Sequence, residues 1–262
     1  MTRHAKKSWM FVLSFAVLTL SQATLAESNG KASVATGFDS TSGNYGTSSN
    51  TSILTIPVIG KYETDSWLFK LTVPYLRVTT VSGVIPGVGG GSMKKAGTVA
   101  TTQSGLGDVV AASTYFAIEG DEDSPGLDLT ARIKLPTADK NAGLGTGETD
   151  YALQADVYQS LGKVTLMGAI GRKFLGSSAA IPLNDIFYGS VGVSYRASAN
   201  VSVGGSLDAA QASFASGSNV LELSAYVSVK IDKTKKIQAY VLKGLADGSP
   251  DTGLGMLLTF VL

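Results

Sequence analysis

The fold is decided by one stretch of sequence, Leu221-Glu222-Leu223-Ser224-Ala225-Tyr226-Val227-Ser228-Val229-Lys230-Ile231. Every second side chain in it is aliphatic, and the side chains between are charged, hydroxylic or aromatic. Successive side chains of a β-strand point to opposite faces, so a period of two predicts a strand with one apolar and one polar face. The stretch is longer than the ~5 to 6 residues that are usual for strands of soluble sheets.

The same alternation recurs along the chain. From Leu127 to Leu135, apolar side chains alternate with polar ones that include Asp128 and Arg132, and from Trp67 to Tyr75 every second residue is aromatic or aliphatic. Twelve such segments are predicted, and their lengths cover the ~9 to 11 residues that a tilted strand needs to cross a bilayer. The segments are residues 31–38, 51–62, 67–80, 106–119, 126–135, 149–160, 163–174, 185–197, 200–210, 219–231, 236–246 and 251–262.

The connections between these segments alternate between short and long, with residues 247–250 as one short exception. Short periplasmic turns and long external loops are typical of bacterial outer-membrane barrels. Lipid cannot satisfy open strand edges, so the last strand has to pair with the first. We therefore predict an all-β fold, a closed antiparallel up-and-down transmembrane β-barrel of about 12 strands with both chain ends on the periplasmic side. A secreted soluble β-sandwich is the alternative architecture.

The N-terminal residues predict export. A basic start at residues 3–7 precedes an apolar run at residues 10–20 and the small-residue end Thr24-Leu25-Ala26. This order predicts a cleaved signal peptide at residues 1–26 and an outer-membrane barrel at residues 27–262. The apolar run is about half as long as the ~20 residues of a membrane-spanning helix, which argues against an N-terminal anchor.

The charge of the predicted mature chain gives no sign of a nucleic-acid partner. Removal of residues 1–26 takes away Arg3, Lys6 and Lys7 and no acid, which leaves 18 basic against 20 acidic residues and a net charge of −2. The densest basic cluster, residues 230–236, is interrupted by Asp232 and lies in a predicted turn. A solvated turn explains it better than a nucleic-acid surface.

The chain has no cysteine, and its one histidine, His4, leaves with the predicted signal peptide. Cysteine nucleophiles and thiolate metal sites are therefore excluded, and the usual general base of serine hydrolases is missing. The acidic turn Asp121-Glu122-Asp123 lacks the spacing of an EF-hand loop. We predict no enzymatic activity, no cofactor and no metal site, although an enzyme built from residues distant in sequence stays a third hypothesis.

Alternation also predicts which charged side chains face the lumen. Five are basic and five are acidic, so their charges cancel overall. A barrel of about 12 strands lies between side-chain-filled barrels of 8 strands and open porins of 16, and we expect a narrow or partly occluded lumen, with a water-lined path as the alternative. The predicted lumen-lining residues are Lys70, Asp128, Arg132, Lys134, Asp150, Asp156, Arg196, Asp208, Glu222 and Lys230.

The connection from Val81 to Gly91 is apolar and rich in glycine, unlike an ordinary solvated loop. It is either a gate or capture surface for a hydrophobic solute that folds over the barrel mouth, or an external loop that is merely glycine-rich. The predicted mouth or gate residues are Val84, Ile85, Pro86, Asp108 and Glu148.

Two glycine-rich runs, residues 105–108 and 143–147, could be mistaken for phosphate-binding loops. Neither opens a predicted helix and neither is followed by a Lys-Ser/Thr pair, as a phosphate cradle requires. Glycine at these positions is instead expected to let the chain turn tightly from loop into strand.

Several of these segments, in this order, resemble the outer-membrane transporter family named for the meta-pathway of phenol degradation. They are Gly43-Asn44-Tyr45-Gly46, Val73-Pro74-Tyr75-Leu76-Arg77, Ser104 to Asp108, and Leu135-Pro136-Thr137 followed by Gly143 to Glu148. The resemblance runs from about residue 31 to the end of the chain, and it implies a small barrel for the passage of small, often aromatic or hydrophobic compounds. The chain departs from the usual aromatic last residue of such barrels, because it ends Phe260-Val261-Leu262.

The sequence therefore predicts an outer-membrane channel or facilitator for passive passage of small hydrophobic or aromatic compounds. Its expected partners are outer-membrane lipid, the solute and the barrel-assembly machinery, for which Phe260 replaces a final aromatic residue. The alternative is a non-conducting structural or adhesive outer-membrane barrel, which an inward charge balance also fits.

Overall fold

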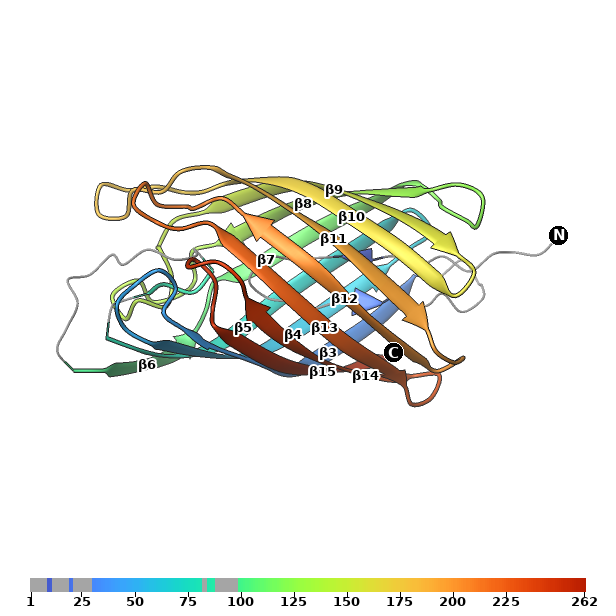
Figure 1. Ribbon diagram of the computed structural model, residues 1–262, viewed down its shortest axis with the longest axis horizontal. Helices are drawn as coiled ribbons and strands as arrows, with labels where there is room; N and C mark the ends of the chain where they lie inside the picture. Colours follow the sequence, from blue (N-terminus) through green and yellow to red (C-terminus); the bar gives the residue numbers. More distant parts are fainter. Residues whose placement is uncertain (1–8, 11–18, 21–29, 82–83, 88–98) are drawn as a thin grey trace.

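A computed structural model describes residues 9–10, 19–20, 30–81, 84–87 and 99–262, and the described part is a barrel of long tilted strands (Figure 1). The signal peptide predicted at residues 1–26 lies outside the described residues, apart from the paired two-residue strands β1 (Trp9–Met10) and β2 (Thr19–Leu20). The remaining strands are β3 (Lys31–Gly43), β4 (Thr51–Glu63), β5 (Trp67–Thr80), β6 (Thr101–Leu106), β7 (Val109–Ile118), β8 (Gly126–Leu135), β9 (Asp150–Leu161), β10 (Val164–Phe174), β11 (Ile186–Arg196), β12 (Val201–Ala210), β13 (Val220–Lys230), β14 (Lys235–Gly244) and β15 (Thr252–Val261).

The strands form one antiparallel sheet that closes on itself. From β7 to β15 each strand pairs with the next, β15 pairs with β3, and β4 pairs with both β3 and β5. At the seam, the backbone N–H of Leu262 donates to the carbonyl of Ala32 at 2.9 Å. The predicted closed barrel of twelve strands is confirmed, and β6 is one additional strand. In the described part of the chain, no helix is long and apolar enough to cross a membrane.

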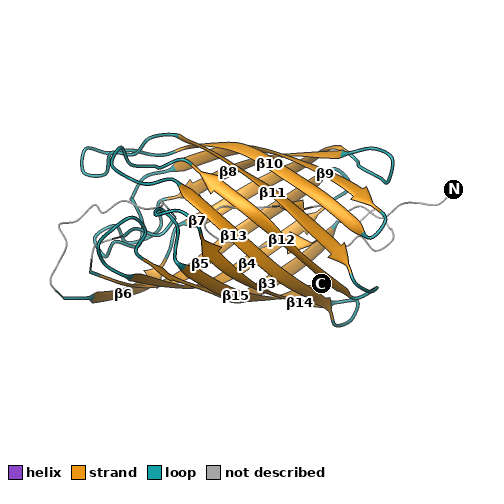
Figure 2. Cartoon of the chain, in the orientation of Figure 1, coloured by secondary structure: helices purple, strands orange, loops and turns teal. Residues whose placement is uncertain are grey.

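The two ends of the barrel differ in their connections (Figure 2). At one end, here called the turn end, neighbouring strands are joined by short links, and Gly162 with Lys163 alone joins β9 to β10. Gly162 has a φ of 60°, a left-handed conformation that glycine adopts without a steric penalty. The opposite, loop end carries the longer connections, at residues 44–50, 81–100, 136–149, 175–185, 211–219 and 245–251. The first residues of β3 and the last of β15 lie at the turn end.

Most strand boundaries lie within three residues of the sequence prediction, and the two larger differences are at the loop end. Strand β3 continues to Gly43, whereas the sequence predicted a loop from Asp39, and all but the last residue of β6 falls in the predicted loop of residues 81–105. The residues concerned are mostly small and polar on both faces. Beyond the apolar band of a membrane the outer face of a strand need not be hydrophobic, so the alternation that identifies a strand is lost there.

An interruption at Gly107 and Asp108 separates β6 from β7. Strand β5 pairs with β7 from Trp67 to Thr72 and with β6 from Tyr75 to Thr80, and between these ladders Gly107 donates its N–H to the carbonyl of Pro74 at 2.8 Å. A Cβ on Gly107 would lie 2.7 Å from Leu76 Cδ1 and 2.9 Å from the Pro74 ring. Close approach therefore explains this glycine, which has no positive φ, instead of the tight turn from loop into strand that the sequence predicted for residues 105–108.

The outer surface of the wall is apolar and carries aromatic side chains near the turn end. Trp67, Phe69 and Tyr115 are exposed, and the rings of Trp67 and Tyr115 lie 4.9 Å apart. Exposed aromatic rings at one level of a barrel are typical of the girdle at a membrane interface.

Other tyrosines point inward, each across the ladder from a glycine. Tyr226 pairs with Gly204, and Tyr240 pairs with Gly255. Tyr158 and Tyr188 face Gly126 and Gly171 in the same way. A side chain at these glycines would occupy the space taken by the tyrosine ring, so the glycines let the rings lie flat against the wall.

Substitution of Gly204 by alanine is expected to destabilise the barrel. Its Cβ would collide with the carbonyl oxygen of Val193 and lie 2.7 Å from Tyr226 Cε1. Overpacking of this kind costs typically about 1 to 3 kcal/mol. Urea unfolding in lipid vesicles measures the difference, and Gly60→Ala is the matched control because no atom lies within 4 Å of a Cβ there. Equal unfolding midpoints for the two variants would contradict the packing role of Gly204.

Candidate functional site

The charged side chains of the strands turn away from the apolar outer surface. Along β8 Asp128 is fully buried while Leu129 is 45% exposed, and along β13 Glu222 is 7% exposed while Leu223 is 50% exposed. The face that carries the charges is therefore the interior of the barrel. Of the ten residues predicted to line the lumen, five are buried and five half-buried. The buried ones are Lys70, Asp128, Asp150, Asp156 and Glu222, and the half-buried ones are Arg132, Lys134, Arg196, Asp208 and Lys230.

Lys134 brings together two of the predicted acidic residues at the loop end. Its Nζ lies 2.8 Å from Asp150 Oδ2 and 3.3 Å from Asp108 Oδ2, and it donates to Thr146 Oγ1 at 3.1 Å. Asp108 also accepts the backbone N–H of Ala138 at 2.9 Å. These contacts hold three neighbouring strands and the connection that follows β8 in one arrangement.

Replacement of Lys134 by methionine is expected to lower the stability of this end of the barrel. The change leaves Asp108 and Asp150 without their cation, and an unsatisfied buried acceptor costs about 1 to 3 kcal/mol. Denaturant unfolding in vesicles measures the loss. The exposed pair of Arg172 with Asp185, 3.2 Å apart, is the control, because solvent screens it and Arg172→Gln should change stability by about 0 to 1 kcal/mol. A Lys134→Met protein as stable as the control would show that the two ion pairs contribute nothing.

A second polar network lies deeper inside. Arg132 Nη1 lies 3.5 Å from the Tyr188 hydroxyl, which donates to Gln154 Oε1 at 3.0 Å. Gln154 Nε2 donates in turn to Asp156 Oδ1 at 2.5 Å. The network connects β8, β9 and β11 along the inner wall, so two of the predicted inward charges, Arg132 and Asp156, are joined through Tyr188 and Gln154.

A cluster of aromatic and apolar side chains lies inside the otherwise largely polar lumen. Tyr158 and Met167, on β9 and β10, pack in one cluster with Tyr226 on β13, and Tyr240 on β14 lies against it. β9 and β13 are separated by three strands in the ring, so the cluster reaches across the lumen. This agrees with a narrow or partly occluded interior.

Residues 84–87, a described part of the connection after β5, lie in the barrel mouth. Val84 is 3% exposed and packs among apolar side chains of β4, β5 and the connection after β8, which include Ile53, Leu76 and Leu144. The neighbouring Ile85 is also buried, and it packs in a second cluster that includes Ile186 and Phe214.

These two clusters lie on opposite sides of the ring, because β4 and β5 are half a turn of the sheet away from β11 and β12. The segment Val84–Gly87, here called the plug, therefore bridges the mouth from wall to wall. Val84 shares its cluster with Leu144, and a Cβ on Gly105 would lie 3.0 Å from Leu144 Cδ1, so the chain near residues 84, 105 and 144 comes together at the mouth. Pro86, Asp108 and Glu148 are half-buried at this end.

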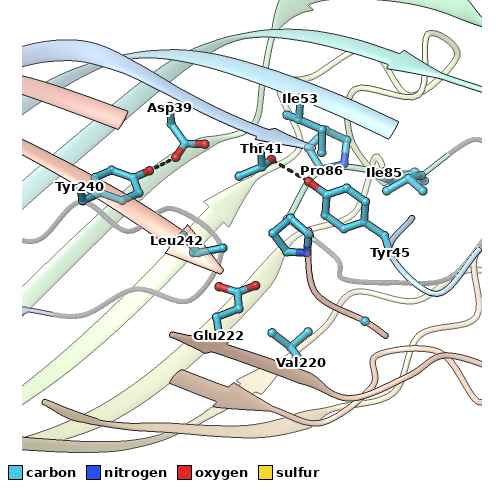
Figure 3. A pocket seen from close by; sticks show the side chains of 14 residues that line it. Asp39, Thr41, Tyr45, Ile53, Ile85, Pro86, Val220, Glu222, Tyr240 and Leu242 are labelled. Carbon is cyan, nitrogen blue, oxygen red and sulfur yellow. Dashed lines mark hydrogen bonds between the residues drawn. The ribbon is translucent and has the colours of Figure 1, made fainter. Parts of the chain in front are cut away.

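A cavity of about 60 Å³ lies beneath the plug. Figure 3 shows its lining, in which Pro86 of the plug lies between Tyr45 and the wall residues Glu222 and Leu242, and Ile85 lies beside Tyr45. The Tyr240 hydroxyl donates to Asp39 Oδ2. Sequence reasoning missed Asp39, which it assigned to a loop, and the inward period of β3 is too weakly marked to have found it.

Tyr45 closes the cavity from the connection after β3. Its hydroxyl donates to Thr41 Oγ1 at 2.6 Å. Burial raises the pKa of Tyr45, with a smaller contribution from the carboxylates nearby, so the hydroxyl stays protonated at neutral pH. The Tyr45 ring and its hydrogen bond to Thr41 fix one wall of the cavity.

The described residues contain no group of three or more acidic or histidine side chains that is placed to hold a metal ion.

A closed antiparallel barrel with an apolar outer surface, an aromatic girdle and a polar, partly occluded interior defines a transmembrane β-barrel of the outer-membrane type. A family model described as "Putative MetA-pathway of phenol degradation" matches residues 24–260. The chain belongs to this family.

One solved structure supports the fold. The β domain of the Bordetella autotransporter BrkA matches with a TM-score of 0.52 at 14% identity, covering 88% of this chain and 99% of that one. Two monoaromatic hydrocarbon channels are also similar: CymD, with a TM-score of 0.40, 8% identity and coverage of 90% and 88%, and the deltaS2S3 mutant of TodX, with a TM-score of 0.41, 10% identity and coverage of 90% and 91%. No curated protein matches the sequence significantly.

Proposed function

We propose that the chain forms a channel in the bacterial outer membrane for passive passage of small hydrophobic or aromatic compounds, and that the plug gates it. The observation that carries the proposal is the way the mouth is closed. The plug packs through apolar side chains against two opposite walls, and it forms neither a strand of the sheet nor ion pairs with the wall among the described residues. Such a seal can open without breaking strand pairing, because the plug is part of a connection.

The chemistry of the interior favours an aromatic solute. The family description refers to the degradation of phenol, a small aromatic compound. Tyr45 and Tyr240 border the cavity, and Tyr158 and Tyr226 lie in the cluster across the lumen below it. Aromatic rings stack on one another favourably, so a planar solute would find contacts along this path.

The closed state does not admit such a solute. The cavity of about 60 Å³ is smaller than the ~150 Å³ of a protein cavity that is known to bind benzene. Passage therefore requires movement of the plug and of the tyrosines below it. The proposed channel needs no energy input and no cofactor. We also propose that the chain is exported by a signal peptide at residues 1–26 and inserted by the barrel-assembly machinery.

Uptake by intact Gram-negative cells tests the proposal, because lipopolysaccharide slows the entry of aromatic solutes. Cells that produce the chain are compared with cells carrying an empty vector, at a concentration of labelled phenol at which entry limits the rate. A higher initial rate is expected. Equal rates, with the folded barrel detected in the outer membrane by its heat-dependent gel mobility, would contradict the channel.

The second candidate function is a non-conducting structural or adhesive barrel. The cluster across the lumen and the closed mouth favour it. Planar-bilayer recording separates the two candidates, since a structural barrel shows no openings under any voltage.

A further inference from the structure

Three carboxylates gather at the loop end of the barrel interior. Asp39 on β3 and Glu222 on β13 line the cavity beneath the plug, and Asp208 on β12 lies directly across the ladder from Glu222. Asp39 and Asp208 are both within electrostatic range of Glu222. Asp39 and Glu222 are each 7% exposed, and Asp208 is half-buried. These three residues are called the acid trio below.

The overall balance of five basic and five acidic lumen residues does not hold locally. Lys134 is engaged by Asp108 and Asp150, while Arg196 and Lys230 lie at the turn ends of their strands. Among the ion pairs of the described residues, none joins a member of the acid trio to a lysine or arginine. Among the described residues, the part of the loop end that holds the acid trio therefore carries a local excess of negative charge, while Lys173 on β10 lies with Lys134 near Asp150.

Two members of the acid trio accept a hydrogen bond from a described residue, and Glu222 does not. Asp39 accepts from the Tyr240 hydroxyl, and Asp208 accepts from Ser206 Oγ at 2.6 Å. Glu222 accepts no hydrogen bond from the part of the chain that the structure describes, although it is more than nine-tenths buried. Its carboxylate points into the cavity toward Pro86 (Figure 3).

This arrangement is unfavourable for the barrel alone. Like charges directly opposite one another on neighbouring strands are destabilising, and a buried carboxylate without a partner carries a desolvation penalty. A bound cation would relieve both effects. The trio does not form a compact metal site, because the described residues contain no group of acids placed to hold a metal ion.

The rest of the lining fits an organic cation. Ile85, Pro86, Val220 and Leu242 give the cavity an apolar side opposite the carboxylates, and Tyr45 and Tyr240 supply aromatic rings. Aromatic faces attract ammonium groups, and an apolar substituent gains from contact with the aliphatic side chains. About 60 Å³ gives room for about four to six water-sized groups, enough for an ammonium head and its first carbon atoms.

We propose that the acid trio and the cavity above it bind a small organic ammonium ion with an apolar or aromatic substituent, directly beneath the plug. The ammonium head and its first carbon atoms occupy the cavity, and an aromatic ring occupies the space that movement of the plug opens. Glu222 accepts the ammonium N–H groups, Asp39 and Asp208 supply the surrounding negative potential, and the substituent lies against Pro86, Val220 and Leu242. The inference rests on the proposed channel function, because it names the solute class that the entrance selects.

The test compares three probes of similar size: phenethylammonium, neutral 2-phenylethanol and anionic phenylacetate. Calorimetric titration of the folded full-length protein in detergent should give the tightest binding for phenethylammonium and the weakest for phenylacetate. Glu222→Gln should weaken the binding of phenethylammonium about tenfold or more, as loss of one charge-assisted hydrogen bond implies, and leave 2-phenylethanol unchanged. Asp247→Asn, at an exposed acid of the same end, is the control and should bind like the parent protein.

Heat-dependent gel mobility shows whether each variant is folded, and Asp208→Asn gives the same test if Glu222→Gln does not fold. Equal affinity for phenethylammonium and 2-phenylethanol, or no loss in either variant, would overturn the inference. The proposed function fails separately. Cells that take up phenol through the barrel without any preference for the ammonium probe disprove only the cation site, whereas cells without phenol uptake disprove the channel.

Discussion

Replacement of Val84 and Ile85 together by serine is expected to open the barrel mouth and to raise single-channel conductance severalfold. Val84 and Ile85 are 3% and 7% exposed, and each belongs to an apolar cluster on a different side of the ring. Burial of one such side chain contributes about 1.5 to 3 kcal/mol. Loss of both weakens the closed state by roughly 3 kcal/mol or more, which is a factor of about 100 or more in the balance of closed and open forms.

Planar-bilayer recording and uptake of labelled phenol measure this effect. Val99→Ser is the matched control, since Val99 belongs to the same long connection and is 73% exposed. Strand pairing does not depend on either position, so both proteins should keep their heat-dependent gel mobility. A double variant that is folded and yet conducts like the parent would show that the plug is not the gate. Loss of folding in the double variant alone would show that the plug is a structural part of the barrel.

The strands that cross the apolar band were predictable because lipid selects one face of each. On β8 and β13 the alternation placed the aliphatic side chains outward, except Val220 at the loop end, and set the inward positions of Asp128 and Glu222. The same rule fails where the strands leave that band. The last residues of β3 and most of β6 carry polar side chains or glycine on both faces, and only the hydrogen-bond ladder shows that they are strands.

The contacts inside the barrel were less predictable than the faces. Alternation says that a side chain points inward but not which other inward side chain it meets. Tyr240 reaches Asp39 only because β15 closes the ring between their strands, and Lys134 reaches Asp108 only because the chain is interrupted at Gly107. The inward tyrosines were also obscured, because aromatic residues in such sequences are expected in the outer girdles, where Trp67 and Tyr115 do lie.

The role of the connection after β5 was only partly predictable. Its apolar, glycine-rich sequence pointed to the mouth but left two hypotheses open, a gate or capture surface for a hydrophobic solute or an external loop that is merely glycine-rich. The burial of Val84 and Ile85 favours the first for the described residues. The acid trio depends on a register that no local pattern contains, because Asp208 and Glu222 face one another only through the pairing of β12 with β13.

Replacement of Leu129 by arginine is expected to impair insertion of the barrel into a bilayer. Leu129 lies in the interior of β8, 45% exposed on the apolar outer surface, and its neighbours on the adjoining strands are Tyr115 and Ala155. An arginine facing lipid near the membrane midplane costs about 2 to 4 kcal/mol, whereas the cost falls to about 0 to 1 near the interface.

Leu161→Arg is the matched control for this depth dependence. Leu161 is 53% exposed on the same surface, but it is the last residue of β9, next to the two-residue turn, where the arginine head reaches water. Equilibrium folding of both variants into lipid vesicles measures the two free energies, and Leu129→Arg should lose about 2 kcal/mol more than Leu161→Arg. Equal losses would mean that β8 does not present Leu129 to the membrane core, and a loss confined to Leu161→Arg would place the apolar band at the wrong end of the barrel.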